Sequence, residues 1–346
     1  MKYSGIGGQA VMEGVMMRNG RKYAVAVRKP DHQIEVKKED NKASLFDEKW
    51  NKVPMVRGVL SFIDSLVLGM STLMYSASFF EDEEEEEKEG KKRKRREKKQ
   101  KRSASADGGE KEKSAGETAL MGGIVAFSIV IAVAVFMILP YYLSQVFQQF
   151  VTDNANLVAI FEGVLRLVIF IGYIVLISRM KDIQRVFMYH GAEHKCINCI
   201  EHGLDLTVEN VRKSSKEHKR CGTSFLVFVI VISIILYLFI RVDSHAMRIV
   251  VRLLLIPVIA GLSYELLRAA GRTENRLIQV LSKPGLWMQR LTVREPDDEM
   301  IQVGIASVEA VFDWRSFVQE VRREAGTEPE EGCGEQEGRT SAEEPS

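Results

Sequence analysis

Long runs of apolar residues dominate the middle of the chain. They cover residues 119–143, 157–178, 222–240 and 249–268. Each run is long enough to cross the hydrocarbon core of a bilayer, which is about 30 Å thick. The first and third runs carry no charged residue, and a soluble core helix seldom stays apolar on every face over such a length. The pattern predicts a mainly α fold, a polytopic helical membrane bundle with four spans.

A further apolar stretch, residues 58–80, is interrupted by serine and threonine and contains one charged residue, Asp64. Its length alone would permit a span. The recurring polar side chains instead favour an amphipathic helix that lies at the membrane interface or packs on the bundle. We therefore predict an interfacial helix, with a fifth span as the alternative.

The N-terminal segment, residues 1–57, is predicted to be a small soluble α/β piece. It opens with a glycine- and methionine-rich sequence. Short alternating stretches rich in β-branched residues then flank Pro30-Asp31, and this pattern is typical of a hairpin.

After the last run, residues 271–323 are predicted to be helical and cytoplasmic. A Pro-Gly pair at 284–285 is expected to break the first helix. Apolar positions at helical spacing over 298–321 predict a single amphipathic helix there. The acidic, glycine-rich tail, residues 324–346, is expected to be disordered.

The net charge of +1 hides a strong segregation of acidic and basic residues. Residues 81–116 contain an acidic run followed by a basic one, and such a segment is expected to be a disordered linker. In a soluble protein the basic run would suggest nucleic acid. Beside a membrane helix, attraction to anionic lipid is the simpler interpretation. The expected partners are therefore the lipid bilayer and anionic lipid, with no nucleic acid.

Lysine and arginine indicate an orientation. They are frequent before residue 119, within 179–221 and after 268, whereas the 144–156 loop has none. The positive-inside rule then places both termini and the 179–221 segment on the cytoplasmic side of the cell membrane. Arg241 and Arg248, in a short loop on the other side, are the weakest point of this assignment.

The 179–221 segment contains the most chemically suggestive residues. His190, Glu193 and His194 form the pattern H-x-x-E-H. On a helix, positions four apart share one face, so both imidazoles can reach one metal ion. Glu193 is then the candidate catalytic base for a water molecule on that ion. The alternative is a pair of solvent-facing histidines at a membrane boundary.

Further donors follow the first motif. His218 and Cys221 precede the third run and add two candidate ligands, and imidazole with thiolate suits zinc or a related divalent transition metal. Cys196 and Cys199 form C-x-x-C, which is either a redox pair or two small buried side chains.

Three acidic residues are candidate accessory groups of the same site: Glu13, Glu201 and Glu265. Glu13 is surrounded by apolar residues and either pairs with Arg18 or completes the site. Glu265 lies near the end of the last run and is either a further ligand or an interfacial residue. Within the spans, Glu162 and Arg166 are four residues apart and are expected to pair, and Arg252 is a further buried charge.

The sequence resembles the bacterial DUF1385 family of YqhQ-like membrane proteins. Five blocks carry the resemblance: GGQAVMEGVMMR (7–18), PMVRGVLSFIDSLVLGM (54–70), YHGAEHK (189–195), LTVENVRKSSKEHKRCGTSF (206–225) and LWMQRLTVREPDDEMIQVGI (286–305). The family motif Y-H-G-A-E-H matches Tyr189 to His194, and H-x-R-C-G-T-S-F matches His218 to Phe225. Cys196 departs from the family pattern. The resemblance implies a membrane protein of unknown function, sometimes described as a predicted metal-dependent enzyme.

Motifs and resemblance together predict a metal-dependent enzyme, a hydrolase, with its site at the cytoplasmic membrane face. The alternative is a non-enzymatic assembly factor, scaffold or regulator whose loop histidines are structural. A third hypothesis is a small-solute transporter, in which the charges inside the spans line a path.

Overall fold

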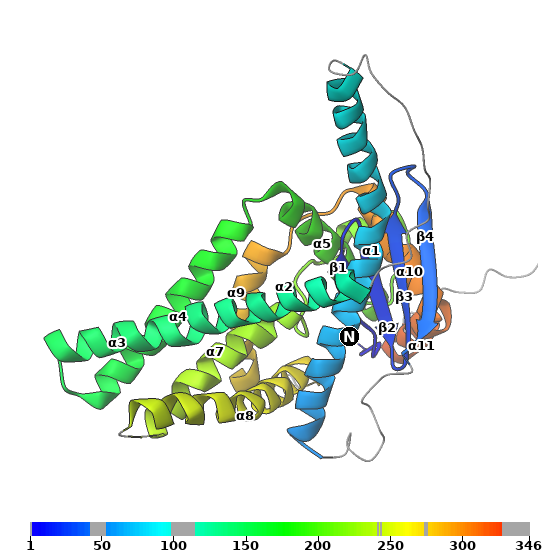
Figure 1. Cartoon of the computed structure of the whole chain (residues 1–346). Coiled ribbons are helices and arrows are strands. Elements are labelled where there is room, and N and C mark those ends of the chain that lie inside the picture. The colour runs from blue at the N-terminus through cyan, green and yellow to red at the C-terminus, as the bar shows by residue number, and fades with distance from the viewer. Residues whose placement is uncertain are drawn as a thin grey trace, which may run out of the picture.

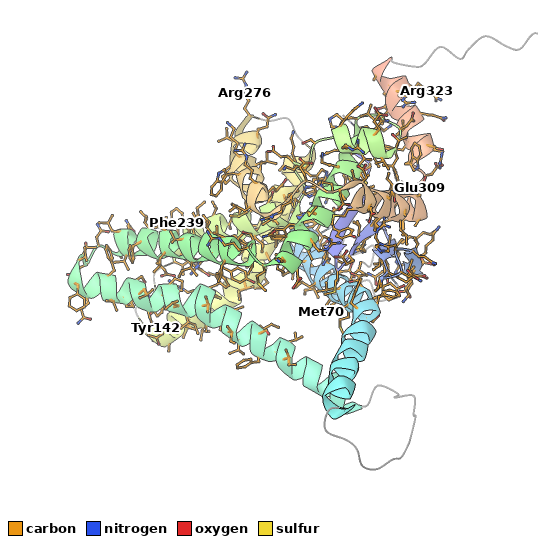
Figure 2. The ribbon with its side chains drawn as sticks, turned by 90° about the horizontal axis from the view of Figure 1, so that it is seen from above. Met70, Tyr142, Phe239, Arg276, Glu309 and Arg323 are labelled. Atoms are coloured by element: carbon orange, nitrogen blue, oxygen red, sulfur yellow. The ribbon has the colours of Figure 1, made fainter. Side chains whose placement is uncertain are left out.

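The computed structural model describes residues 2–41, 53–97, 115–240, 242, 244–272 and 276–326. Figure 1 shows a bundle of long helices that meets, at one end, a small sheet covered by shorter helices. Figure 2 places Tyr142 and Phe239 toward the opposite end of the bundle from Glu309 and Arg323. The predicted mainly α fold with a small N-terminal piece is confirmed.

The bundle helices coincide with the predicted runs. They are α2 (Ala115–Val133), the π-helical turn η2 (Ala134–Ile138), α3 (Leu139–Phe150), α4 (Ala155–Ile177), α7 (Gly222–Phe239) and α8 (His245–Arg272). The first predicted span is longer than expected, because helix continues without interruption to Phe150. Pro140 does not break it, because the π-helical turn η2 directly before Pro140 changes the local hydrogen-bond pattern of the helix.

Helix α1 (Val56–Glu97) is the element whose placement the sequence left open. Among the described residues, five helices are long and apolar enough to cross a membrane, and residues Val56–Phe80 of α1 form one of them. In Figures 1 and 2, however, α1 runs across the ends of the bundle helices and not alongside them. Gly58 allows this crossing, because a Cβ there would lie 3.1 Å from the Cα of Gly261 on α8. Both the interfacial helix and the fifth span stay predictions.

Helix α1 also extends beyond its predicted end at residue 80. It continues to Glu97, where a disordered linker was expected. Residues 81–97 are rich in glutamate and lysine, and both residue types have favourable intrinsic helix propensity. The remainder of the predicted linker, residues 98–114, lies outside the described residues.

The N-terminal piece is a four-stranded antiparallel sheet with strand order β1-β2-β3-β4. The strands are β1 (Gly7–Val11), β2 (Gly14–Asn19), β3 (Lys22–Arg28) and β4 (Ile34–Asp40). The hairpin around Pro30-Asp31 is confirmed as β3-β4, with Val27 opposite Glu35. Strands β1 and β2 were not predicted, because glycine is a poor strand former and both of their faces are apolar.

The sheet is a middle layer. Val15, Met17 and Ala26 on one face pack against helices α5 (Lys181–Glu201) and α10 (Asp298–Val311). Met16 and Val25 on the other face pack against Leu68 of α1. Burial on both faces removes the alternation of apolar and polar residues by which a strand is recognised in sequence.

The segment after the bundle differs from the prediction in two places. Helix α9 (Arg276–Thr292) continues through Pro284. Gly285 packs so closely on α7 that a Cβ there would lie 2.6 Å from Ser224 Oγ. Packing of α9 against α7 therefore outweighs the tendency of the Pro-Gly pair to end the helix.

The predicted helix 298–321 is two helices, α10 and α11 (Trp314–Ala325), because Asp313 caps the second by accepting the Ser316 N–H at 3.2 Å. The tail from 327 lies outside the described residues.

Candidate metal centre

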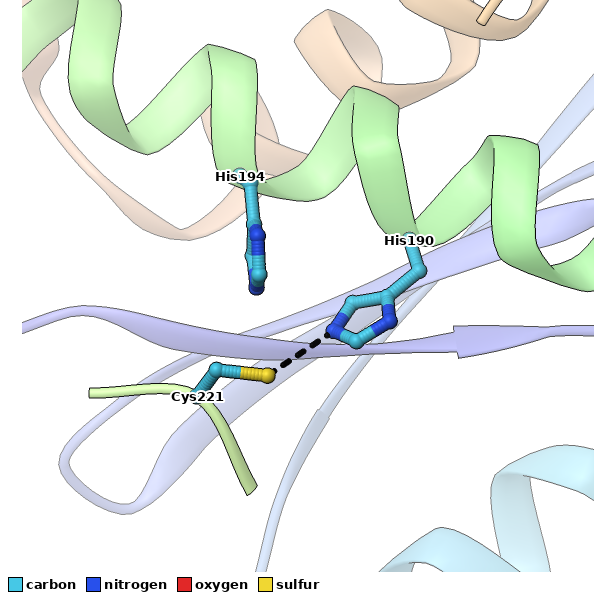
Figure 3. A group of neighbouring side chains, drawn as sticks. All are labelled: His190, His194 and Cys221. Atoms are coloured by element: carbon cyan, nitrogen blue, oxygen red, sulfur yellow. Dashed lines mark hydrogen bonds between the residues drawn. The ribbon is translucent and has the colours of Figure 1, made fainter. Parts of the chain in front are cut away.

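The H-x-x-E-H motif lies on α5, which supplies the helical context that the metal interpretation requires, and both of its histidines face Cys221 (Figure 3). The ligand atoms of His190, His194 and Cys221 all lie within 4.8 Å of one another. His190 Nε2 is 3.2 Å from Cys221 Sγ. Helical spacing brings the two imidazoles to one face, and the segment before α7 supplies the sulfur.

Backbone carbonyls hold both imidazoles in the same way. His190 Nδ1 is 3.1 Å from the carbonyl oxygen of Thr292, and His194 Nδ1 is 2.6 Å from that of Lys216. Because a carbonyl oxygen can only accept, each Nδ1 carries the proton of these hydrogen bonds. The Nε2 of each ring is therefore the atom presented to the site, an arrangement typical of metal-binding histidines.

Cys221 is the N-cap of α7, and its sulfur accepts the Thr223 N–H at 3.4 Å. Burial would raise the pKa of this thiol, but His190 and His194 outweigh burial and hold the pKa well below its ordinary value. Conversely, burial would lower the pKa of His190, and the Cys221 sulfur raises it to about 9. Without a metal the site thus favours a thiolate beside an imidazolium. Thiolate is the form of cysteine that binds metal, and a bound ion would displace the proton from His190 Nε2, since histidine binds metal in its neutral form.

Glu193 lies beside this donor group and is only 5% exposed. Its Oε2 is 3.9 Å from His190 Nε2, and burial raises the pKa of its carboxyl group. The backbone of Gly8 packs so closely against the Glu193 side chain that a Cβ on Gly8 would lie 2.7 Å from Glu193 Cγ. A buried carboxylate with a raised pKa is suited to general-base catalysis near neutral pH.

His218, the remaining predicted ligand, lies next to the donor group and not within it. Its ring is 5.4 Å from that of His194, and its Nε2 accepts a hydrogen bond from Arg220 at 3.2 Å. The Gln289 side chain holds its backbone, accepting from His218 N at 2.9 Å and donating to His218 O at 2.7 Å. Burial lowers the pKa of His218 well below its ordinary value, so the ring is neutral.

Glu13 supports α5 from outside the donor group. It pairs with Arg185, and the Tyr189 hydroxyl donates to it at 3.3 Å. The predicted pair with Arg18 is wrong, since Arg18 binds Asp64 at 2.6 Å. Glu13 has a positive φ of 48° in the turn between β1 and β2.

The other two acidic candidates are also engaged elsewhere. Glu201 accepts hydrogen bonds from Ser4 N at 2.9 Å and Ser4 Oγ at 2.7 Å, and it pairs with Arg220. Glu265 accepts a hydrogen bond from Arg57 Nε at 2.7 Å. Glu201 thereby positions the arginine that holds His218, whereas Glu265 links α8 to α1.

Cys196 and Cys199 are free thiols buried on the opposite side of α5 from the donor group. Burial raises the pKa of Cys199 to about 11 and that of Cys196 well above its ordinary value. Such thiols are poor nucleophiles. Two small buried side chains, and not a redox pair, fit this environment.

Two residues of the site were missed from the sequence, Arg220 and Arg268. Both line a cavity of about 250 Å³ together with His190, Glu193 and Cys221. Arg220 was detectable, because it lies inside the block that also contains Cys221. Arg268 lies 48 positions after Arg220, on α8, and no local pattern marks it.

The predicted pair of Glu162 and Arg166 inside the bundle is confirmed, and Arg252 joins it. Arg166 binds Glu162 at 2.9 Å and Ser233 Oγ at 3.0 Å. Arg252 binds the other carboxylate oxygen of Glu162 at 2.7 Å. We call Glu162, Arg166 and Arg252 the bundle cluster.

Comparison with known proteins gives a family but no activity. The family model of DUF1385, described as a protein of unknown function, matches residues 53–314. The chain is 34% identical over 309 residues to the uncharacterized protein YqhQ of Bacillus subtilis (strain 168), which covers 87% of this chain and 90% of that protein. No solved structure matches the chain.

Proposed function

Since this chain belongs to the DUF1385 family, whose function is unknown, we propose its function from its own site: a metal-dependent hydrolase embedded in the membrane. His190, His194 and Cys221 hold a divalent transition metal, and Glu193 is the catalytic base. The observation that carries the proposal is the pair of Nδ1 hydrogen bonds to the carbonyls of Thr292 and Lys216. They aim two Nε2 atoms and one sulfur at a common point.

The donor set supports zinc in a catalytic role. Two imidazoles and one thiolate are three protein ligands, which leave a fourth position open, as in catalytic zinc sites. A bound divalent ion lowers the pKa of a coordinated water molecule toward neutrality. Glu193 lies close enough to His190 to take the proton from such a water, and the carboxyl group is already shielded from bulk solvent.

The proposed setting is the cytoplasmic face of the cell membrane, with both termini in the cytoplasm. The site lies where the bundle meets the sheet, at the end where α1 crosses it. Many lysines and arginines of the 179–221 segment belong to this end, which supports the orientation through the positive-inside rule.

A second candidate function uses the same residues without a metal. The 3.2 Å contact between His190 Nε2 and Cys221 Sγ, with the sulfur at a helix N-terminus, also suits a nucleophilic cysteine activated by histidine. Metal analysis separates the two candidates, because only the first needs an ion.

The test is the metal content of full-length protein purified with a tag that contains no histidine. We expect about one zinc, iron or manganese per chain in the wild type and less than about 0.2 in His190→Ala/His194→Ala. His202→Ala is the matched control, because His202 is exposed and outside the donor group. A wild-type content below about 0.2, unchanged after incubation with zinc, would contradict the metal reading.

A further inference from the structure

The metal centre lies at the junction of a polar cavity and an apolar one. The polar cavity, of about 250 Å³, is lined in part by Arg220 and Arg268. A second cavity, of about 670 Å³, begins at the same site. His190, Glu193 and Cys221 line both cavities. A molecule that filled both would place its middle against the donor group.

Much of the apolar lining of the larger cavity comes from α1 and α7, and residues of β1, α5 and α8 complete it. The apolar residues of α1 and α7 are Phe62, Leu66, Met70 and Leu73 of α1 and Phe225 and Leu226 of α7. Leu66 is 56% exposed and Met70 is 45% exposed. Both helices are apolar enough to reside in a membrane, and in lipid such exposed walls are favourable, whereas in water they would be an aggregation hazard. The groove between α1 and α7 is therefore suited to an alkyl chain.

The groove continues into the bundle. Phe62, Phe225 and Leu226 also line a third cavity of about 360 Å³, which reaches Ser233 further along α7. From Phe225 to Ser233 the helix rises by about 12 Å. The lining of this third cavity is mostly apolar, and the Arg166 side chain that also borders it is already bound to Glu162 and Ser233. The path from the donor group into the bundle therefore suits a long alkyl chain.

We propose that this site binds a phospholipid-like amphiphile. The polar headgroup occupies the cavity beside Arg220 and Arg268, whose positive charges attract a phosphate group. Arg220 Nη2 already donates to Glu201 and His218, so its remaining N–H groups would make the contact. The alkyl chain occupies the groove between α1 and α7. The bond that joins the two parts then lies against His190, Glu193 and Cys221. Cleavage of that bond rests on the proposed hydrolase function, but binding of the amphiphile does not.

Photocrosslinking tests the proposal in full-length protein. The protein is placed in phosphatidylcholine nanodiscs that contain a small fraction of phosphatidylglycerol with a diazirine in its acyl chain, and adducts are located by peptide mass spectrometry. We expect adducts on Leu66, Met70 and Leu226 to exceed those on Val130 of α2. Val130 is 64% exposed and reports ordinary contact with surrounding lipid.

A groove-filling variant makes the experiment decisive. Leu226→Trp should reduce labelling of Leu66 and Met70 at least about fivefold, because a packed groove leaves no room for a chain. Leu254→Trp is the control, since Leu254 is 70% exposed on α8 and lines none of these cavities. Groove labelling no higher than that of Val130, or labelling unaffected by Leu226→Trp, would overturn the proposal.

The metal variants separate this proposal from the hydrolase function. His190→Ala/His194→Ala should lose metal and keep the groove labelling, because the apolar walls remain. Wild-type protein that lacks metal but shows groove labelling would contradict only the hydrolase. Protein that holds metal but shows no groove labelling would contradict only the amphiphile.

Discussion

The metal centre and the bundle cluster are both buried groups of ionisable side chains, but their partners differ. In the bundle cluster, each carboxylate oxygen of Glu162 has its own guanidinium, Arg166 at 2.9 Å and Arg252 at 2.7 Å. In the metal centre, the Nε2 atoms and the sulfur face one another. Direct pairing of a carboxylate with guanidinium groups indicates a structural role, whereas convergent electron-pair donors indicate a place for a bound ion.

Aromatic rings complete the bundle cluster. Arg166 lies over Tyr237 at 5.2 Å, and Arg252 lies over Tyr237 at 4.9 Å and Tyr141 at 4.8 Å. The rings favour the guanidinium charge that one carboxylate alone does not balance. The charges therefore tie α4 to α8, which favours a structural role over the solute path considered from the sequence.

The largest expected effect on stability is that of Glu162→Gln. The substitution leaves Arg166 and Arg252 buried without a counter-charge, so it should destabilise the protein by about 3–5 kcal/mol. Thermal unfolding in detergent, followed by intrinsic fluorescence, measures the change, and the metal content should stay at the wild-type value. Glu209→Gln is the control, because its pair with Lys213 is exposed and should contribute less than about 0.5 kcal/mol. Equal stability of the two variants would contradict the structural role of the cluster.

An intermediate effect is expected for Gly191→Ala, which perturbs the metal centre through its support. A Cβ at Gly191 would lie 2.0 Å from the carbonyl oxygen of Arg294. The segment that carries the Thr292 carbonyl must then shift, at a cost of roughly 1–3 kcal/mol, and the metal content should fall as well. Gly172→Ala on α4 is the matched control, because a Cβ there meets no atom within 4 Å. Gly191→Ala with normal stability and full metal content would show that this support is not needed.

The smallest expected effect, of opposite sign, is that of Glu193→Gln in the metal-free protein. Burial raises the pKa of Glu193 above its unfolded value, so the folded state favours the neutral carboxyl group. Below the ordinary glutamate pKa both states are protonated, and the variant should match the wild type. As pH rises through the raised pKa, the variant should become more stable by roughly 1 kcal/mol. Unfolding of chelator-treated protein from pH 4 to 8 tests this, and destabilisation at high pH would indicate that the carboxylate is structural.

The sequence by itself determined the spans and the helical motif. The hydrophobic runs between 119 and 268 are local properties of the chain, and lipid requires each spanning segment to satisfy its own backbone. The shared face of His190 and His194 follows from helix periodicity alone. The hairpin at Pro30-Asp31 is equally local.

Tertiary structure decided which donors meet. Cys221 joins the two histidines and His218 does not, because Gln289 and Arg220 hold His218 in another direction. The carbonyls that orient the imidazoles belong to Lys216 and Thr292, which are 22 and 102 residues away from the rings they hold. The course of α9 through Pro284 and the place of α1 across the bundle depend likewise on packing between distant segments. No periodicity or composition encodes such contacts, since they depend on how separate elements pack against one another.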